Sequence, residues 1–571
     1  MTEFYELFKS TKYISIQERK EIEDLYLPLY KKTKRNIFYI FTKQKRCFVR
    51  DYQNIKNIVD TSNEQYLTTS INNNRILLSN VNGYSLDCEQ SRAVLSEEKN
   101  TLIIAGAGSG KTLTIVGKIR YLIEHKLVEE KDILCISFTN ATTQSLKHNL
   151  KNEYDYDVDV FTFHKLALNI LSRHNFNITE SDTLDYIINE FYDYIIFEYP
   201  TAMKIVLEYF DIFSSNYISK YENLKTRKSF LSFKRLLSQF IHLFKANVYN
   251  DNNLYKYLKK ATGKDYCFLR CVIIIYNIYR SELDSGREID FDDMIIKATE
   301  EVKNYGCKKY KHIIIDEYQD TSLVRNKLIE AIINYSGSTL TVVGDDFQSI
   351  YKFTGSNLDV FLDFENIFPN SKTLYLNNTY RNSQELISIA GSFIMKNKKQ
   401  MKKKLKSNIT NLKPIKIIYY DDLKNTFKKI ITLFKNSNSP VLVLGRNNND
   451  IFKAIDTDYV YNNSTVYLND FSFTYLTVHR SKGLEEENVI IINLEDSITG
   501  FPNKIEESDV LKYIIPLNEV IPYEEERRLF YVAITRTKNY NYLLVPRKKQ
   551  SLFVRELLRD YKGYIEILNL D

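Results

Sequence analysis

Cysteine is scarce in this sequence, and its spacing argues against the common thiolate metal sites. The six cysteines include no Cys-x-x-Cys pair, the unit from which zinc ribbons and iron–sulfur sites are built. Cys267 and Cys271 are one helical turn apart, but no further Cys or His cluster joins them. We therefore expect reduced thiols, several of them buried as small apolar side chains, in a cytoplasmic protein.

Long apolar runs are also missing. The N-terminus lacks a basic start followed by an apolar stretch, so it does not resemble a signal peptide. No uninterrupted run approaches the roughly 20 residues that span a bilayer, so we expect no membrane partner. The net charge of +7 suits a polyanionic partner but does not by itself identify one. Tryptophan is absent, and no functional conclusion follows from that.

Short apolar strands alternate with helices in two parts of the chain. Such continuous apolar strands are typical of parallel sheets that are covered on both faces. We expect an α/β protein of two parallel-sheet domains with a cleft between them. The strands of the first series are predicted at 102–104, 133–137, 313–315 and 340–343, and those of the second at 415–418, 441–444, 489–492 and 542–545.

The remaining segments are predicted to be helical. Residues 165–285 contain almost no Gly or Pro and interrupt the first strand series as an inserted helical domain. Residues 1–83 are polar, with basic clusters at 31–35 and 43–50. The predicted domains are 1–83 (N-terminal extension), 84–164 with 286–375 (first sheet domain), 165–285 (inserted domain) and 376–571 (second sheet domain).

A strand, a glycine-rich loop and a helix come together at residues 102–123 in the arrangement of a phosphate-binding loop. The glycines let backbone N–H groups approach phosphates closely, and the helix N-terminus adds a favourable dipole. Lys111 is expected to reach the β- and γ-phosphates and Thr112 to ligate Mg²⁺. The loop residues expected to bind ATP are Ala105, Gly106, Ala107, Gly108, Ser109, Gly110, Lys111 and Thr112.

Two carboxylates follow the apolar strand at 313–315, at the end of the strand where ligands bind in such sheets. Asp316 is expected to hold Mg²⁺ through water. Glu317 is expected to orient or deprotonate the attacking water. Together with the loop, these acids predict hydrolysis of a nucleoside triphosphate.

The acids also open a longer string, DEYQDTS at 316–322, that resembles motif II of UvrD/Rep-type superfamily 1 helicases. Other segments resemble further motifs of that family, in its order. They are LDCEQ (86–90), SFTN (137–140), TFH (162–164), DFDD (290–293), GDDFQSIY (344–351), NTYRNS (378–383), TVHRSKGLE (477–485) and EEERRLFYVAITR (524–536). Phe347, the string TFHKLAL at 162–168 and the N-terminal extension make the pattern most similar to the helicase IV branch.

The resemblance implies two RecA-like domains with ATP and Mg²⁺ between them. Charge on the γ-phosphate would draw two arginines of the second domain inward, and hydrolysis would release them. The implied nucleotide contacts are Gln90 on the adenine edge, Gln348 and Arg381 on the γ-phosphate, Tyr380 stacked on adenine, Glu485 on the ribose and Arg536 as second arginine finger.

Single-stranded DNA would be held by aromatic platforms and backbone contacts, which tolerate any sequence. Each aromatic side chain is about as consistent with a place in the core as with a place in a DNA site. The resemblance places on DNA the residues Phe138, Thr139, Asn140, Phe163, His164, Tyr351, Phe353 and His479. Thr354 stands where many relatives carry Arg, which puts that arginine's contact in doubt.

The interval between Arg446 and Thr477 is too short for the large mobile insertion that these helicases usually carry. We therefore expect translocation along single-stranded DNA with weak unwinding by the chain alone. The family implies 3′-to-5′ polarity, action at DNA junctions, and a role in repair, recombination or defence, with a nuclease or repair factor as a protein partner.

Several alternatives remain open on the sequence. The chain could instead be an ATP-gated DNA-sensing subunit that controls a nuclease without useful unwinding, and RNA could replace DNA as the strand. Residues 1–83 could dock DNA or protein, or could simply pack against the first sheet domain. The Lys-rich run at 396–406 fits a solvated helix face or a phosphate track.

Overall fold

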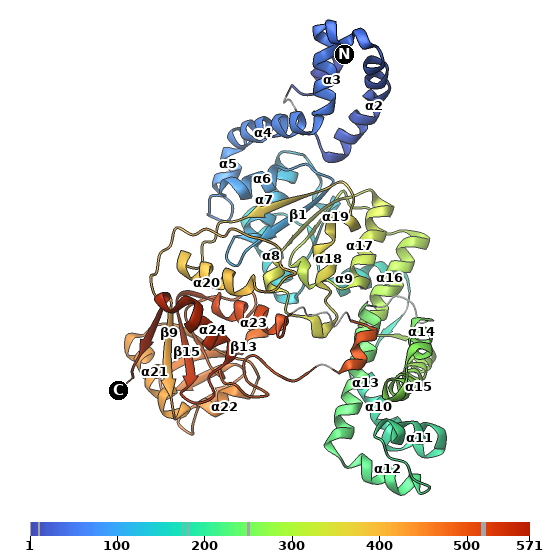
Figure 1. Cartoon of the computed structure of the whole chain (residues 1–571), viewed down its shortest axis with the longest axis vertical. Coiled ribbons are helices and arrows are strands. Elements are labelled where there is room, and N and C mark those ends of the chain that lie inside the picture. The colour runs from blue at the N-terminus through green and yellow to red at the C-terminus, as the bar shows by residue number, and fades with distance from the viewer. Residues whose placement is uncertain are drawn as a thin grey trace.

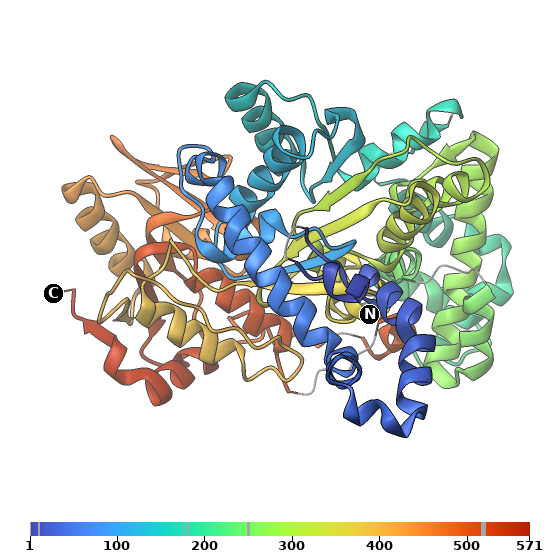
Figure 2. The same ribbon diagram turned by 90° about the horizontal axis from the view of Figure 1, so that it is seen from above.

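The computed structural model describes residues 2–9, 12–174, 176–179, 182–247, 252–506, 508–515 and 521–570. Two β-sheets form its centre, and a helical hairpin and a helical lobe project from opposite sides of the first sheet domain (Figures 1 and 2). The predicted α/β class with two sheet domains is confirmed. Among the described residues, no helix has both the length and the apolar character needed to cross a bilayer.

The first sheet has six parallel strands in the order β3-β2-β6-β7-β1-β8. Four of them confirm the predicted strands, whereas β3 and β8 were not predicted. Their bounds are β1 Asn100–Ala105, β2 Ile133–Ile136, β3 Asp159–Phe161, β6 His312–Ile315, β7 Thr339–Gly344 and β8 Ser371–Leu376. The helices around the sheet are α6 Cys88–Leu95, α7 Lys111–Glu124, α8 Asn140–Tyr154, α9 Phe163–Ile170, α16 Phe291–Tyr305, α17 Leu323–Ser336, α18 Leu358–Leu362 and α19 Phe364–Ile367.

Alternate residues of these strands enter two separate cores. Along β1, Leu102 and Ile104 belong to one apolar cluster, while Ile103 and Ala105 belong to another on the opposite face. The burial of both faces explains why the strands are apolar throughout rather than alternating. Because the strands are parallel, the polar residues that follow each strand lie together at the carboxyl end of the sheet.

The inserted helical domain is a lobe with a core of its own. A short parallel pair, β4 Asn177–Ile178 and β5 Glu288–Ile289, joins the two chain crossings at its base. Its core is rich in aromatic side chains such as Tyr192, Phe230 and Phe268. The helices are α10 Thr183–Asp193, α11 Pro200–Tyr209, α12 Tyr217–Lys225, α13 Lys228–Asn247, α14 Asn252–Lys260 and α15 Gly263–Gly286.

The second sheet has eight strands in the order β11-β12-β13-β10-β14-β15-β9-β16. The four predicted strands are present as β9, β10, β14 and β15, which run parallel to one another. The strand bounds are β9 Ile415–Tyr420, β10 Val441–Gly445, β11 Val460–Asn462, β12 Thr465–Leu468, β13 Phe471–Thr477, β14 Glu486–Ile491, β15 Thr537–Pro546 and β16 Ile565–Leu568. The helices are α20 Gln384–Ile394, α21 Leu423–Ser437, α22 Asp450–Ala454, α23 Glu524–Ile534 and α24 Leu552–Tyr561.

The short interval before motif V is filled by α22 and by three strands, β11, β12 and β13, the last of which ends at Thr477. β11 pairs with β12 and β12 with β13, so the interval becomes the edge of the second sheet. The interval is therefore more ordered than the loop and single strand expected for it, and it forms no separate helical domain.

The Lys-rich run at 396–406 is not the solvated helix face offered as one interpretation. α20 ends at Ile394, and the run continues as irregular chain along the first sheet domain. The Lys403 side chain is only 2% exposed because it enters a pair of carboxylates. Lys398, Lys399, Lys402, Lys404 and Lys406 remain exposed, so Lys403 is the buried exception within the run.

The second sheet domain sends an arm into the inserted helical lobe, which the sequence did not predict. The described parts of this arm are residues 492–506, 508–515 and 521–523, between β14 and α23, and Figure 1 shows a red helical turn of it against the helical lobe. Val510, Leu511 and Ile514 lie in the apolar core of that lobe. Lys512 Nζ lies 2.7 Å from a carboxylate oxygen of Asp265. Two parts of the chain that are far apart in sequence thus share one core.

Leu511→Asp is expected to release this arm. Leu511 is 1% exposed, and a carboxylate without a partner is strongly disfavoured in such a core. Limited proteolysis should then cut the arm, while the two sheet domains stay resistant. Lys512→Gln is the matched control, since that side chain is 48% exposed and should leave the arm protected. An arm that stays protected in Leu511→Asp would contradict the importance of this contact.

The N-terminal extension consists of an inner and an outer part. α4 Ile55–Asn73 and α5 Arg75–Ser79 place Leu67, Leu77 and Leu78 in the core of the first sheet domain. The outer part comprises α1 Thr2–Glu6, α2 Ile16–Arg35, the 3₁₀ helix η1 Ile37–Phe41 and α3 Lys43–Gln53. It has its own small core around Phe4 and Phe48. Packing against the sheet domain therefore accounts for the inner part, whereas the outer part contacts that domain near the start of α2, where the Ile16 N–H donates to Glu98 at 2.9 Å.

Candidate nucleotide site and strand-binding cleft

The loop after β1 has the backbone of a phosphate cradle. Gly108 and Gly110 have φ angles of 71° and 77°, and Lys111 begins α7. A β-carbon at Gly108 would lie 2.5 Å from Cβ of Arg381, and one at Gly110 would lie 2.5 Å from Nε2 of Gln90. These approaches and the positive φ angles require glycine, and they leave the N-terminus of α7 facing the loop.

Glu317 lies opposite this loop, just beyond the end of β6. Its Oε1 is 2.7 Å from Nζ of Lys111, and its Oε2 is 3.6 Å from Nζ of Lys482. Burial opposes its ionisation, but the charges of the two lysines outweigh burial and hold the pKa of Glu317 below its usual range. Glu317 is thus ionised in this arrangement, and its oxygens can accept hydrogen bonds from a water molecule.

Asp316 has the properties of a ligand for a divalent cation. Burial, and then the charge of Glu317, raise the pKa of Asp316 to about 6. Within the described part of the chain it has no ion pair with Lys or Arg; its Oδ1 accepts a hydrogen bond from the Glu317 backbone N–H at 2.9 Å. Thr112, the second residue of α7, offers a hydroxyl oxygen. Carboxylate and hydroxyl oxygens are donors that Mg²⁺ prefers, so these residues fit the ion.

Arg536 reaches the site from the second sheet domain. Its side chain is almost fully buried, and Nη2 donates to Oε1 of Gln348 at 3.0 Å across the domain boundary. Its other nitrogens donate to the backbone oxygens of Val532 and Leu484, at 2.9 and 3.2 Å. Burial, and then the charge of Arg381, lower the pKa of Arg536 to about 9.

No carboxylate forms an ion pair with Arg536 in the part of the chain that the structure describes. A guanidinium that is buried beside another cation and hydrogen-bonded mainly to oxygen dipoles creates a site of positive potential. Arg381 is held nearby, where its Nε donates to Oε2 of Glu485 at 2.6 Å. The pair can therefore stabilise an anion that enters between the two domains.

Motif V contributes a further cation, Lys482, whose role the sequence did not reveal. Its ammonium group forms an ion pair with Asp320 and donates to the backbone oxygen of Gln348 at 2.8 Å. It thus joins the second domain to motifs II and III of the first. Burial raises the pKa of Asp320 to about 6 despite the charge of Lys482.

Lys403 adds a cation from the Lys-rich run. Its Nζ lies 2.6 Å from Oδ1 of Asp346 and also pairs with Asp345. The ammonium group lies 4.0 Å from the centroid of the Phe347 ring, in cation–π contact. Burial opposes the charge on Lys403, but the two carboxylates outweigh burial and raise the pKa of its ammonium group. Lys403 therefore fixes the start of motif III, the segment that carries Gln348.

Lys403→Ala is expected to destabilise the protein by about 3–5 kcal/mol, the usual cost of removing one partner of a buried ion pair. The carboxylates of Asp345 and Asp346 would remain buried without their cation. The thermal unfolding midpoint of the purified chain measures this loss. Lys402→Ala is the control, because Lys402 is the exposed neighbour in the same run. Equal midpoints for the two variants would show that the buried pair contributes nothing.

The residues expected at the adenine lie together at the edge of the loop. Tyr380 is 55% exposed, and its hydroxyl donates to Oδ2 of Asp87 at 2.6 Å. Gln90 is buried, and both ends of its amide are already bonded: Nε2 donates to Ser109 O at 2.9 Å, and Oε1 accepts from the Asp87 N–H at 2.9 Å. Tyr380 has a free ring face for a base, whereas Gln90 must give up a bond to read one. Both roles remain predictions.

Half of the expected DNA residues gather where the two sheet domains meet. The rings of Phe138 and Tyr351 stack with centroids 5.6 Å apart. Phe353 is 50% exposed, and its ring packs edge-on against His479 at 5.3 Å. The hydroxyl of Tyr351 donates to the backbone oxygen of His479 at 3.0 Å, which joins motif III to motif V. Phe138 and Tyr351 cover one ring face of each other, and the guanidinium group of Arg325 lies 5.1 Å from the centroid of Phe138. The half-exposed Phe353 ring therefore has the most surface left for stacking of a base.

The other expected DNA residues lie on the first domain. Thr139 and Asn140 are exposed at the start of α8, where the Thr139 hydroxyl caps the helix by accepting from the Thr142 N–H at 3.1 Å. Burial, and then the charge of Arg325, lower the pKa of His164 to about 4. Burial, with the charges of Arg446 and Lys482, does the same for His479. Both histidines are therefore neutral at pH 7 and would act as hydrogen-bond partners rather than as cations.

Phe163 corrects the expected DNA list. It is only 4% exposed and belongs to the core of the first sheet domain. It starts α9, and the helix turns its ring inward, beneath the guanidinium group of Arg325. It therefore has no free ring face for a base. Of the two places considered for each aromatic side chain, the core and a DNA site, Phe163 occupies the core.

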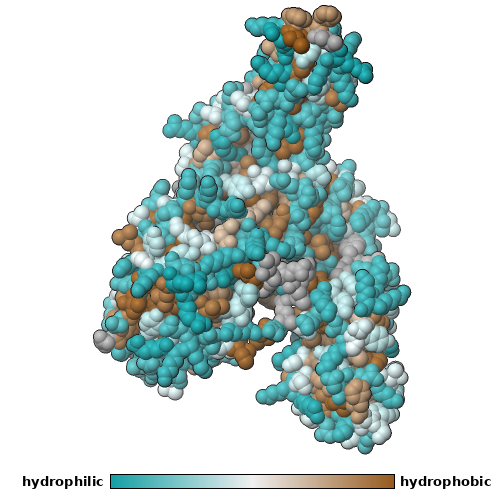
Figure 3. Space-filling model, in the orientation of Figure 1, coloured by the Kyte–Doolittle hydropathy of each residue, from teal (hydrophilic) through white to brown (hydrophobic). Residues whose placement is uncertain are grey.

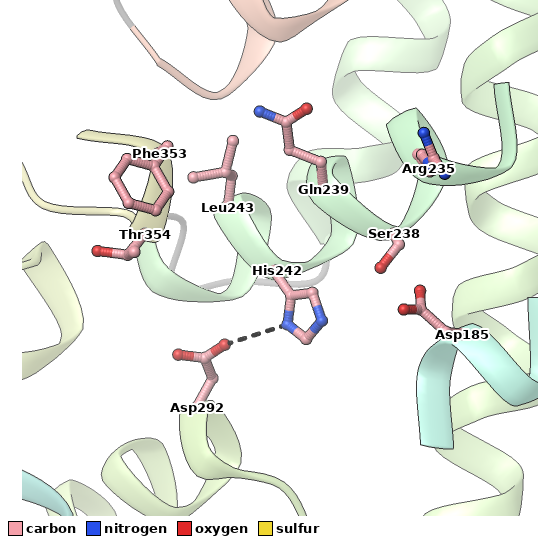
Figure 4. A pocket seen from close by; sticks show the side chains of 9 residues that line it. All are labelled: Asp185, Arg235, Ser238, Gln239, His242, Leu243, Asp292, Phe353 and Thr354. Atoms are coloured by element: carbon pink, nitrogen blue, oxygen red, sulfur yellow. Dashed lines mark ion pairs between the residues drawn. The ribbon is translucent and has the colours of Figure 1, made fainter. Parts of the chain in front are cut away.

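A cavity of about 420 Å³ continues the cleft toward the helical lobe (Figure 4). Phe353 and Thr354 line it from the end of motif III, and α13 contributes Arg235 and His242 from the other side. Nδ1 of His242 lies 3.9 Å from Oδ2 of Asp292. Thr354 thus lines a cavity that has an arginine, Arg235, on its opposite wall.

Comparison with known protein families agrees with this geometry. Residues 86–369 match the UvrD/REP helicase N-terminal domain. Residues 462–547 match the UvrD-like helicase C-terminal domain. The chain belongs to the UvrD/Rep helicase family. The motifs of this UvrD/Rep chain fall inside the two matches or between them, and the nucleotide site lies where the two matched parts meet.

Relatives of this UvrD/Rep chain include DNA helicase IV of Escherichia coli, which is 25% identical over 83% of this chain and 70% of its own length. The ATP-dependent DNA helicase PcrA of Staphylococcus epidermidis is 30% identical over 59% of this chain and 43% of its own length. The ATP-dependent DNA helicase Rep of Buchnera aphidicola is 30% identical over 56% of this chain and 44% of its own length. The chain thus spans less than half of the PcrA and Rep relatives.

Proposed function

We propose that the chain is an ATP-dependent motor that moves 3′-to-5′ along single-stranded DNA. The observation that carries this proposal is Arg536, a buried guanidinium from the second domain that has no carboxylate partner among the described residues and touches Gln348 of the first. A triphosphate between the domains would supply the missing negative charge. Its arrival and its hydrolysis would then change the attraction between the domains.

Each side chain of the nucleotide site has a defined task in this proposal. Lys111 holds the β- and γ-phosphates, and Glu317 orients the attacking water and takes its proton. Gln348 reports the state of the γ-phosphate, because its amide contacts Asp345 at 2.6 Å and Arg536 at 3.0 Å. Mg²⁺, held by Thr112 and Asp316, would neutralise charge on the phosphates when bound.

Movement requires that the strand be gripped differently as the cleft opens and closes. Phe138 and Tyr351 belong to the first domain, whereas His479 belongs to the second. Closure of the cleft would therefore change the distance between the two aromatic rings and His479. Base stacking on such platforms is worth roughly 1–3 kcal/mol per base without sequence preference. Phe353 and the cavity beside it extend the proposed strand path toward α13.

The second candidate function is an ATP-gated DNA-sensing subunit that controls a nuclease. The observation that favours it is the interval before motif V, which holds only α22 and three short strands. A motor without the larger insertion lacks one element for opening a duplex. The protein partner would then be a nuclease or a repair factor, and DNA junctions would be the structures recognised.

Strand displacement and ATP hydrolysis by the purified chain, measured together, separate these functions. We expect DNA-stimulated hydrolysis, and weak displacement of a short duplex with a 3′ tail and none with a 5′ tail. Hydrolysis with no movement on either tail would favour the sensing subunit. Processive opening of long duplexes by the isolated chain would refute the expected weak unwinding. A matched RNA strand that stimulates hydrolysis equally well would overturn the preference for DNA.

A further inference from the structure

The outer N-terminal hairpin ends in a tip with an unusual concentration of charge. The tip is defined here as residues 31–50, the end of α2, η1 and most of α3. It contains eight Lys and Arg residues and no Asp or Glu. Because the whole chain has a net charge of +7, the tip holds more than all of that excess, and the rest of the chain is close to neutral. The positive field of the protein is thus concentrated at one end of the molecule.

The cations of the tip are poorly neutralised. Arg50 pairs with the adjacent Asp51 at 2.8 Å, and Lys34 bonds to the hydroxyl of Tyr30 at 3.0 Å. For the other six, no ion pair is recorded among the residues that the structure describes; they are Lys31, Lys32, Arg35, Lys43, Lys45 and Arg46. All of these except the half-buried Lys45 are exposed. Such a group lowers its own repulsion by binding a polyanion.

Two exposed aromatic rings lie between the two basic clusters. Phe38 is 73% exposed and Phe41 is 82% exposed, and their centroids are 6.4 Å apart. Ile40, between them, is 49% exposed. Apolar atoms lie at the free end of the hairpin in Figure 3. Large rings exposed at a protruding end mark a contact surface rather than ordinary surface variation.

The hairpin is rigid enough to present this surface. Phe4 and Phe48 form its core, and the rings of Tyr30 and Tyr52 stack at 4.5 Å across the two long helices. Ile14 is tied to α4 by two hydrogen bonds with Asn63, both 2.8 Å long. Since α4 packs against the first sheet domain, the tip is held at a fixed place, on the opposite side of that domain from the helical lobe (Figure 1).

We propose that the tip is a second nucleic-acid site, which binds duplex DNA outside the strand-binding cleft. The basic clusters that precede and follow the two phenylalanines can contact the two phosphate rows that border a DNA groove. The two phenylalanine rings can act as the apolar wedges that some proteins insert between base steps. The convex shape of a hairpin end fits a groove, whereas a single strand needs a channel. This inference rests on the proposed function, because a motor on one strand has duplex DNA beside it.

A tip bound to duplex DNA tethers the motor to its substrate. Binding at the cleft then becomes partly intramolecular, so a tailed duplex is held more tightly than its single-stranded tail alone. An anionic membrane surface also combines phosphate charge with an apolar interior, and an acidic protein also attracts cations. The DNA duplex is favoured because the tip belongs to a chain whose other site is built for a DNA strand.

The test measures binding of a fluorescent blunt duplex and of oligo(dT) over a range of salt concentrations. The first variant is Lys31→Gln/Lys32→Gln/Arg35→Gln, and the second is Phe38→Ser/Phe41→Ser. The control is Lys256→Gln/Lys259→Gln/Lys260→Gln, which removes three exposed cations from α14 on the helical lobe. Hydrolysis of ATP stimulated by oligo(dT) is measured for all three, and circular dichroism verifies their fold.

The first variant should lose about tenfold or more in duplex affinity, and the slope of log affinity against log salt should become shallower by about 3. The second should lose about tenfold in duplex affinity with an unchanged slope. The control should change neither, and oligo(dT) should stimulate every variant equally. Loss of duplex binding in a chain that oligo(dT) does not stimulate would support the tip and refute the motor.

Three results would overturn the proposal. The first is unchanged duplex affinity in both tip variants. The second is an equal loss in the α14 control, which would mean that only total charge matters. The third is binding to vesicles of anionic phospholipid that the tip variants abolish while duplex binding persists, which would assign the tip to a membrane surface instead.

Discussion

Lys111→Ala should abolish DNA-stimulated ATP hydrolysis and leave DNA binding largely intact. Lys111 is the cation of the phosphate loop, and its Nζ lies 2.7 Å from Glu317. Burial opposes its charge, but Glu317, Asp345 and Asp316 outweigh burial and keep the pKa of Lys111 raised. Removing it takes one preorganised donor from the phosphates and leaves Glu317 without its nearest cation. A loss of at least about 10²–10³ in kcat is expected.

Steady-state hydrolysis with saturating oligo(dT), beside anisotropy with labelled oligo(dT), measures both parts of this prediction. Lys131→Ala is the control, since Lys131 is 69% exposed on the surface of the same domain. Undiminished turnover in Lys111→Ala would refute the nucleotide-site assignment. A parallel loss of DNA binding would instead indicate that the variant has not folded.

Arg536→Ala should lower kcat by about 10³–10⁵, the range for removal of an arginine finger. Arg536 of the second domain contacts the side chain of Gln348, so the transition-state charge would lose this partner across the cleft. Nucleotide binding should weaken much less, because the loop and Lys111 lie in the first domain. Arg536→Lys should recover only part of the rate, since an ammonium group cannot reproduce the guanidinium fork.

Single-turnover hydrolysis and binding of a non-hydrolysable ATP analogue separate these effects. Arg547→Ala is the matched control, because Arg547 belongs to the same domain but is 56% exposed and pairs with Asp421 at the surface. Turnover of Arg536→Ala within about tenfold of the unmodified chain would refute a trans-domain arginine. Loss of analogue binding as large as the loss of rate would place Arg536 in ground-state binding instead.

The parts of this structure that sequence reasoning recovered are those dictated by local pattern. Leu102–Ala105 is apolar on both faces and runs into glycines, so a buried strand and a phosphate loop follow from adjacent residues. Asp316 and Glu317 follow another such strand, and parallel strands bring both features to one sheet edge. The eight predicted strands required no knowledge of which strands pair.

The features that were missed depend on contacts between distant segments. Lys403 looks like one lysine among many in its run, and only the approach of Asp345 and Asp346 gives it a buried partner. Leu511 enters the core of a lobe that begins more than two hundred residues earlier. Phe163 sits in a motif that resembles DNA-contacting segments, yet helix orientation decides which way a ring points. The positions of Lys403, Leu511 and Phe163 cannot be predicted from a regular pattern of apolar residues.

The arm and the tip extend the account beyond the nucleotide site. The arm places Leu511 of the second domain in the helical lobe, so movement of that domain acts on the lobe directly. The tip places eight cations on the far side of the first domain. In this account the two sheet domains hydrolyse ATP, the aromatic cluster holds the strand, and these two projections connect the motor to the remainder of its substrate.

The most direct test of the central claim is the time that the chain takes to reach the end of a single strand. Oligo(dT) of increasing length carries a fluorophore at its 5′ end, and the signal is followed after ATP is added with a trap for free protein. For a 3′-to-5′ motor, the arrival time should grow linearly with length, and the arrival signal should appear only with the label at the 5′ end and should be lost in Lys111→Ala. An arrival time independent of length would contradict this claim.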